Sequence, residues 1–176
     1  MVTGPDSTHA MRPDQADEVD ALLRAAFGKP DEAELVKRLR ADGDLLVELV
    51  KPWDGCVAGY AALSRMRAPI GWACLAPVAV LPRLQRGAIA PPDAGFGPHN
   101  IGTRLVGEIA ASAGTSDELR TIVVLGDTGF YSRAGFSHER VQRLSSPYGT
   151  EHTLIARPGE DVPEEELIYA KAFEAL

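Results

Sequence analysis

A glycine-rich segment that runs directly into a helical pattern is the part of this sequence best suited to chemistry. It comprises Gly97, Pro98, His99, Asn100, Ile101, Gly102 and Thr103. The N–H groups of a helix's first turn lack partners inside the helix and lie at the positive end of its dipole, so they can hold a pyrophosphate. Gly102 lets a ligand approach the backbone, and Thr103 adds a hydroxyl donor. The segment predicts either an anion site or a purely structural loop.

Two better-known phosphate-binding motifs are absent. The sequence contains no G-x-x-x-x-G-K-S/T, so a P-loop nucleotidase is not supported. The dinucleotide-binding fingerprint is also missing after the first predicted strand, where that fold requires it.

The composition predicts one ordinary globular domain, because 176 residues suit a single core and 45% of them are hydrophobic. Lys and Arg number 18 against 25 Asp and Glu, a formal charge of −7. This balance excludes a nucleic-acid binder that depends on neutralising phosphates, but it allows a small polyanion whose charge is met locally.

The two cysteines, Cys56 and Cys74, predict neither a disulfide framework nor a zinc ribbon, and we expect no metal. No apolar stretch is long enough for a membrane span, and the N-terminus lacks the pattern of a signal peptide. We therefore expect a cytoplasmic protein that binds no membrane, with residues 1–8 disordered.

The chemistry-bearing segments must be positioned by helices and strands, which periodicity predicts in this order. Helical spacing covers 13–27 and then a shorter stretch around Leu35 to Leu39 that closes at Gly43. Apolar runs follow, which predict an antiparallel pair over 45–50 and 56–63 and a third strand over 72–81.

Prolines and glycines in 82–98 predict an extended loop. After it we expect a helix from Ile101 to Ala113 with Asn100 as its N-cap, a strand over 121–125, a helix over 129–134 and closing strands over 136–141 and 152–156. Residues 164–166 are expected to start a solvated helix. The apolar segment 167–173 should pack on the domain or meet a second subunit, which leaves a monomer or a homodimer open.

The stretch from Val123 to Asp127, followed by Phe130-Tyr131-Ser132-Arg133-Ala134-Gly135-Phe136, resembles the GNAT superfamily of acyl-CoA-dependent N-acyltransferases. In that family a strand ends near an aromatic-Tyr-x-Lys/Arg-x-Gly-Phe segment, and residues 75–82 look like its central strand. The resemblance covers about Met11 to Ala156. It implies an α/β (α+β) fold with a mixed, largely antiparallel central sheet flanked by helices, here as one domain over residues 9–176.

Two segments compete for the family's pyrophosphate loop, whose pattern is Gln/Arg-x-x-Gly-x-Gly/Ala followed by a helix. Residues 85–90 match in part, but Pro91 and Pro92 would stop the required helix. Residues 97–102 have Asn100 in a glycine place, yet a well-patterned helix follows at once, so we choose this register. Asn adopts left-handed backbone more readily than most residues. Residues 87–98 are then an insertion, either a lid or a solvent-exposed excursion.

The resemblance implies a direct transfer in one ternary complex, with acetyl-CoA as donor and a primary amine on a small molecule or peptide as acceptor. Donor amides would pair beside Val78 and Val80, and an N–H near Val78 or Ala79 would polarise the thioester. Tyr131 would protonate the departing thiolate, and Arg133 would assist phosphate binding or simply face solvent.

The expected donor-binding residues are Val78, Ala79, Val80, Gly97, His99, Asn100, Ile101, Gly102, Thr103 and Arg133. Glu48, Asp127 and His152 are conceivable bases without a spacing pattern, so the base is left unassigned. The alternative to an enzyme is a non-catalytic acyl-CoA sensor or a degenerate family member kept for protein interaction.

Overall fold

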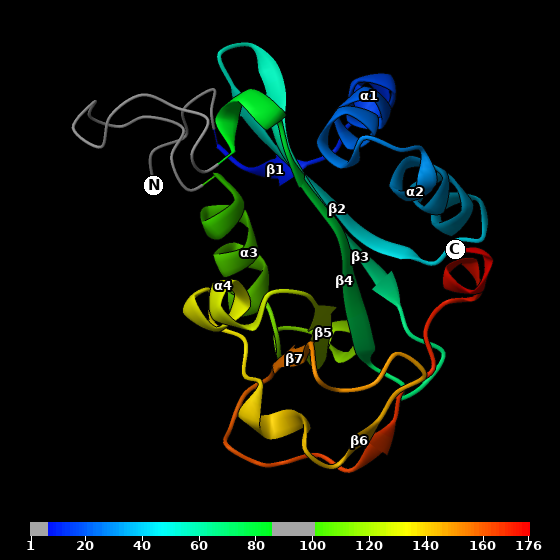
Figure 1. The fold of residues 1–176 in the computed structure, drawn as a ribbon, viewed down its shortest axis with the longest axis vertical. Coiled ribbons are helices and arrows are strands. Elements are labelled where there is room, and N and C mark those ends of the chain that lie inside the picture. The colour runs from blue at the N-terminus through cyan, green and yellow to red at the C-terminus, as the bar shows by residue number, and fades with distance from the viewer. Residues whose placement is uncertain (1–6, 86–100) are drawn as a thin grey trace.

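A six-stranded sheet forms the centre of the structure, a computed structural model that describes residues 7–85 and 101–176. Its strands, in spatial order, are β1 (His9–Ala10), β2 (Leu45–Trp53), β3 (Cys56–Arg65), β4 (Trp72–Val80), β5 (Thr121–Leu125) and β7 (Thr153–Ala156). Among the described strands of this sheet, only β4 and β5 pair in parallel. The predicted mixed, largely antiparallel sheet is confirmed (Figure 1).

Helices cover both faces of the sheet (Figure 1). They are α1 (Ala16–Phe27) and α2 (Asp31–Ala41) on one face, and α3 (Ile101–Ala111) and α4 (Thr128–Arg133) on the other. α1 buries the stripe Val19, Leu22 and Leu23 that its spacing predicts, and Gly28 ends it in the left-handed conformation at φ 68°.

Two short segments differ from the expectation. Residues 136–141 do not form a strand: Ser137 alone bridges to Ile155, and a 3-10 turn covers Glu139–Val141. Phe136 and Val141 are both buried, but they belong to a turn and not to a strand. Apolar residues in so short a segment therefore led to the wrong prediction of a strand. Glu165–Glu166 forms β8 rather than a helix start, and it pairs in parallel with β6 (Leu144–Ser145).

The apolar C-terminal segment packs on the chain itself. Leu167, Tyr169 and Ala170 are at most 4% exposed, and Phe173 packs with them in the same cluster as Leu35 and Leu39 of α2. Of the two expectations for this segment, packing on the domain is confirmed.

The predicted insertion at 87–98 lies outside the described residues, as does most of the N-terminal segment 1–8. Within the described parts of the chain, the helices are too short or too polar to cross a bilayer.

Candidate active site

Strands β4 and β5 run side by side only at their beginnings. Trp72 to Leu75 pair with Thr121 to Val124, and no pairing continues beyond that point. β5 ends at Leu125, whereas β4 goes on to Val80 and stays paired with β3 on its other edge. Within the described parts of the chain, the second half of β4 therefore has an edge without a strand neighbour.

An extra residue in β4 changes which side chains face that open side. Ala61 pairs with Val78 and Leu63 with Leu75, so three residue steps along β4 lie opposite two residue steps along β3. This is a β-bulge, and Pro77 lies within it. As a result Leu75 and Val78 pack in one cluster with α3 and α4, whereas Ala79 packs with α1 on the opposite face.

One backbone hydrogen bond shows which N–H and C=O groups of β4 point toward β3 after the bulge. Leu81 N–H donates to Ala58 O at 2.8 Å, which makes the facing Gly59 and Val80 a pair that is not hydrogen-bonded across the strands. The N–H and C=O of Val80 thus point away from β3. Because backbone direction in a strand repeats every two residues, the N–H and C=O of Val78 also point away from β3. The Gln85 side chain donates to Val80 O at 3.0 Å from that open side.

The start of α3 is fixed on β3 by a close approach to Gly59. A Cβ at Gly59 would lie 2.7 Å from Ile101 Cγ2, so any side chain there would displace the first residue of the helix. One residue later, a Cβ at Gly102 would lie 3.4 Å from Val80 Cγ2. The first turn of α3, whose N–H groups have no partners inside the helix, is therefore held beside the open end of β4.

Helix α4 places Tyr131 on the same side. Asp127 Oδ1 accepts the Phe130 N–H at 2.6 Å and caps the helix. The Tyr131 ring packs edge-on against Phe130 and Phe136, with ring centroids 4.9 and 5.9 Å away. A Cβ at Gly126 would lie only 2.5 Å from Tyr131 Cε2, so the glycine is required for this ring position.

Burial is the main cause that raises the pKa of Tyr131 to about 12, with smaller contributions from the nearby Cys74 and Asp127. The phenol is therefore neutral and a proton donor throughout the physiological range. Asp127 is occupied by its capping bond, and Glu48 accepts from the Tyr60 hydroxyl at 2.7 Å and pairs with Arg40, so both serve the fold.

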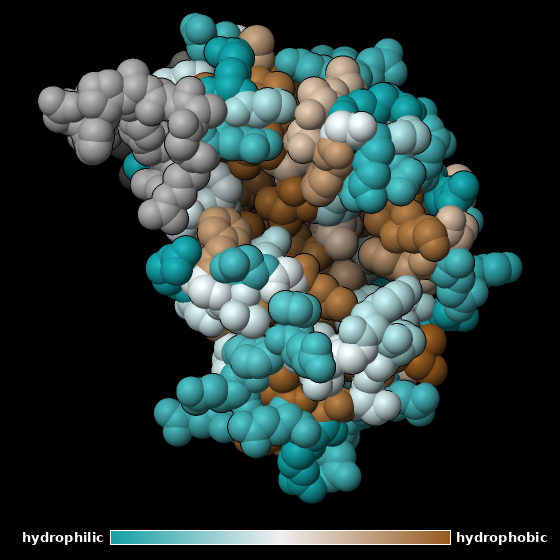
Figure 2. Space-filling view, in the orientation of Figure 1, coloured by the Kyte–Doolittle hydropathy of each residue, from teal (hydrophilic) through white to brown (hydrophobic). Residues whose placement is uncertain are grey.

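These parts enclose a cleft of about 670 Å³. It is lined by the expected residues Val78, Val80, Ile101, Gly102, Thr103, Tyr131 and Arg133, together with Leu84, Gln85, Arg104 and Phe130. Two of these side chains are arginines, and none of the described residues that line it is acidic. Figure 2 shows hydrophobic residues gathered in a hollow over the central strands, between the helices of the two faces.

Some expected residues are not in this cleft. The Ala79 side chain is buried on the other face of the sheet. Gly97, His99 and Asn100 lie outside the described residues. Arg104 and Phe130 line the cleft, but they were not predicted as site residues. Each is adjacent in the sequence to a predicted site residue. Because successive side chains of helices α3 and α4 point in different directions, adjacency alone does not predict which of them line the cleft.

No family model matches the chain. An N-acetyltransferase of Escherichia coli K12 called YhbS, described as uncharacterised, is 35% identical over 128 residues, which cover 70% of this chain and 69% of that protein. The chain belongs to the GNAT family of N-acetyltransferases.

Solved GNAT structures agree with this membership. A GNAT acetyltransferase from Brucella melitensis, in complex with acetyl-CoA, is 31% identical with a TM-score of 0.71, over 95% of this chain and 97% of that one. The E. coli YhbS structure, in complex with CoA, is 29% identical with a TM-score of 0.78, over 99% and 96%. The resemblance, the fold class and an N-acetyltransferase activity are thereby confirmed.

Proposed function

We propose that this GNAT enzyme transfers an acetyl group from acetyl-CoA to a primary amine by direct attack in a ternary complex. The observation that carries the proposal is that Val78 and Tyr131, which lie far apart in the sequence, line one cleft at the open edge of β4. The ligands of the two GNAT structures, acetyl-CoA and CoA, support the choice of donor.

The open edge of β4 suits the amide-bearing arm of the donor. Val78 and Val80 direct backbone groups away from β3, so an extended chain with amides can pair there as an added strand. Of the two expected N–H groups, Val78 is favoured to polarise the thioester carbonyl, because the N–H of Ala79 points toward β3.

The charge around the cleft suits the donor's phosphates. The first turn of α3 presents N–H groups around Gly102 and Thr103, and Arg104 and Arg133 add positive charge at the exposed rim. Since no acid lines the described part of the cleft, the −7 charge of the chain does not oppose binding there.

Tyr131 then acts as the general acid. The neutral amine attacks the thioester carbon, the N–C bond forms and the C–S bond breaks. Tyr131 gives its proton to the sulfur and recovers one from the nitrogen, so an amide and a free thiol are the products.

Calorimetry with acetyl-CoA and CoA tests donor binding, and release of CoA thiol in the presence of primary amines tests turnover. We expect Tyr131→Phe to keep the Kd of acetyl-CoA within about twofold and to lower kcat about 100-fold or more. Ser132→Ala, an exposed neighbour outside the cleft, is the control.

Two results would contradict the proposal. Absence of donor binding at millimolar concentration would favour the degenerate, non-catalytic alternative. Unchanged turnover in Tyr131→Phe would remove this residue from its role as acid.

A further inference from the structure

The chain that leaves β4 turns back at once toward the open edge of that strand. A 3-10 turn over Pro82–Leu84 follows β4 almost directly. Leu84 is only 7% exposed and packs in one cluster with Ala58 of β3 and Ile101 of α3, so the turn is anchored on both elements. Gln85 comes next, and its side chain lines the donor cleft.

The Gln85 carboxamide occupies a backbone group that an added strand would need. Gln85 Nε2 donates to Val80 O at 3.0 Å. This carbonyl points away from β3, because Val80 and Gly59 face each other as a pair without hydrogen bonds between them. An extended chain that pairs with this edge brings one of its own N–H groups to the same oxygen. The Gln85 side chain therefore lies where an N–H of an added strand would lie.

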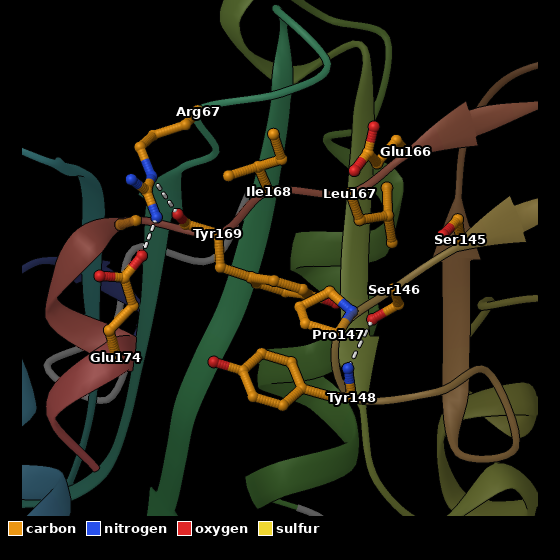
Figure 3. A pocket seen from close by; sticks show the side chains of 11 residues that line it. Arg67, Ser145, Ser146, Pro147, Tyr148, Glu166, Leu167, Ile168, Tyr169 and Glu174 are labelled. Carbon is orange, nitrogen blue, oxygen red and sulfur yellow. Dashed lines mark hydrogen bonds and ion pairs between the residues drawn. The ribbon is translucent and has the colours of Figure 1, made fainter.

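A comparison with Arg67 shows that the Gln85 contact is easy to replace. Arg67 also donates to a backbone carbonyl, Tyr169 O at 2.7 Å, and Glu174 holds the same guanidinium in an ion pair (Figure 3). The Gln85 side chain is exposed and forms no other hydrogen bond with a described residue. Since water competes for a single exposed hydrogen bond between neutral groups, a ligand can take its place at little cost.

Val80 O lies on the path that the donor has to follow. A Cβ at Gly102 would lie 3.4 Å from Val80 Cγ2, so Val80 lies against the first turn of α3, where the proposed function puts the donor's phosphates. The proposed function puts the thioester at Val78, two residues earlier in β4. Because the amide-bearing arm joins these two ends of the donor, it passes the carbonyl that Gln85 occupies.

We propose that the Gln85 side chain competes with the donor for Val80 O. In the empty enzyme the carboxamide bonds this oxygen and covers part of a strand edge that another chain could otherwise pair with. When acetyl-CoA binds, one of its amide N–H groups replaces the carboxamide, which turns to water. The inference rests on the proposed function, which places the amide-bearing arm along β4. Gln85 thus weakens donor binding by the strength of its own contact.

Calorimetry with two probes, acetyl-CoA and adenosine 3′,5′-bisphosphate, tests the proposal. The second probe carries the nucleotide of CoA without the amide-bearing arm. We expect Gln85→Ala to lower the Kd of acetyl-CoA about threefold, because the competing hydrogen bond is removed, and to leave the Kd of the nucleotide unchanged. Gln85→Met keeps a side chain of similar length without an N–H donor, so it should tighten acetyl-CoA by the same factor.

Gln142→Ala is the matched control, because Gln142 is an exposed glutamine that does not line the cleft. It should leave both Kd values unchanged.

Three results would overturn the inference. One is a Kd of acetyl-CoA that stays the same or rises in Gln85→Ala. Another is a fall in Kd that Gln85→Met does not share, since the bulk of the side chain and not its hydrogen bond would then be the cause. The third is an equal fall for adenosine 3′,5′-bisphosphate. Failure of the unmodified enzyme to bind acetyl-CoA would instead contradict the proposed function and, with it, the inference.

Discussion

The two halves of β4 are both apolar but differ in their pairing. Up to Leu75 the strand is paired on both edges and fully buried, with Ala73, Cys74 and Leu75 at most 2% exposed. From Val78 on it is paired with β3 alone, and alternate residues are partly exposed in the cleft. The first half stabilises the sheet, and we propose that the second offers backbone groups and side chains to the donor.

The difference shows that the candidate site arises because β5 ends before β4 does, and not because β4 contains unusual residues. Both halves of β4 consist of apolar residues. What changes is that β5 turns away into α4 after Leu125, which brings Tyr131 to the edge that β5 leaves open. Substitutions in the two halves should therefore separate stability from binding.

The largest effect is expected from Leu75→Ala in the doubly paired half. Removing this buried side chain should lower the free energy of unfolding by about 2–5 kcal/mol, measured by urea denaturation, with an unchanged Kd for acetyl-CoA. Val78→Ala should show the reverse pattern, with a stability loss of about 1 kcal/mol or less and a Kd about fivefold higher. If both variants lose stability and affinity together, the two halves do not have separate roles.

A smaller effect, on turnover alone, is expected from Gly126→Ala. The new Cβ would collide with the Tyr131 ring at 2.5 Å and push the hydroxyl out of place, so kcat should fall about tenfold while the Kd of acetyl-CoA changes little. Gly107→Ala in α3 is the control, because its Cβ would meet only Ala134 O, at 3.9 Å. A normal kcat in Gly126→Ala would show that the ring position is not critical.

The smallest effect is expected on kcat at alkaline pH. Because burial raises the pKa of Tyr131 to about 12, the acid stays protonated and kcat should not fall between pH 8 and pH 10. The rate should instead rise over this range as the amine loses its proton. A fall in kcat with a midpoint near 10, absent in Tyr131→Phe, would mean that the phenol is exposed to water and not buried in the cleft.

The sequence predicted best those elements whose burial is uniform. The strand Thr121–Leu125 was predicted with its observed bounds, since every residue in it is apolar or β-branched and lies between two other strands. The segment 136–141 was predicted wrongly, because Arg140 there bonds to the carbonyl of Arg157 at 2.9 Å and to Asp161 and holds a turn. The hydrophobic periodicity of a short segment carries no information about hydrogen bonds to residues far along the chain.

The lining of the candidate cleft could be predicted from the sequence only in part. Val78 and Tyr131 belong to short motifs, and the fold brings both to one cleft. The bulge that turns Ala79 away depends on the pairing of β4 with β3 and leaves no local signal. The contact in which Arg67 donates to Tyr169 O at 2.7 Å was not predicted, because the two residues are 102 apart in the chain and meet only through tertiary packing.

The contact between Gly59 and Ile101 has a consequence for protein engineering. Since the first residue of α3 is seated directly on β3, a substitution at Gly59 would shift the start of the helix although Gly59 does not line the cleft. Libraries that vary the donor cleft should therefore leave Gly59 unchanged, whereas Gly59→Ala offers a way to reshape the cleft without replacing any residue of its lining.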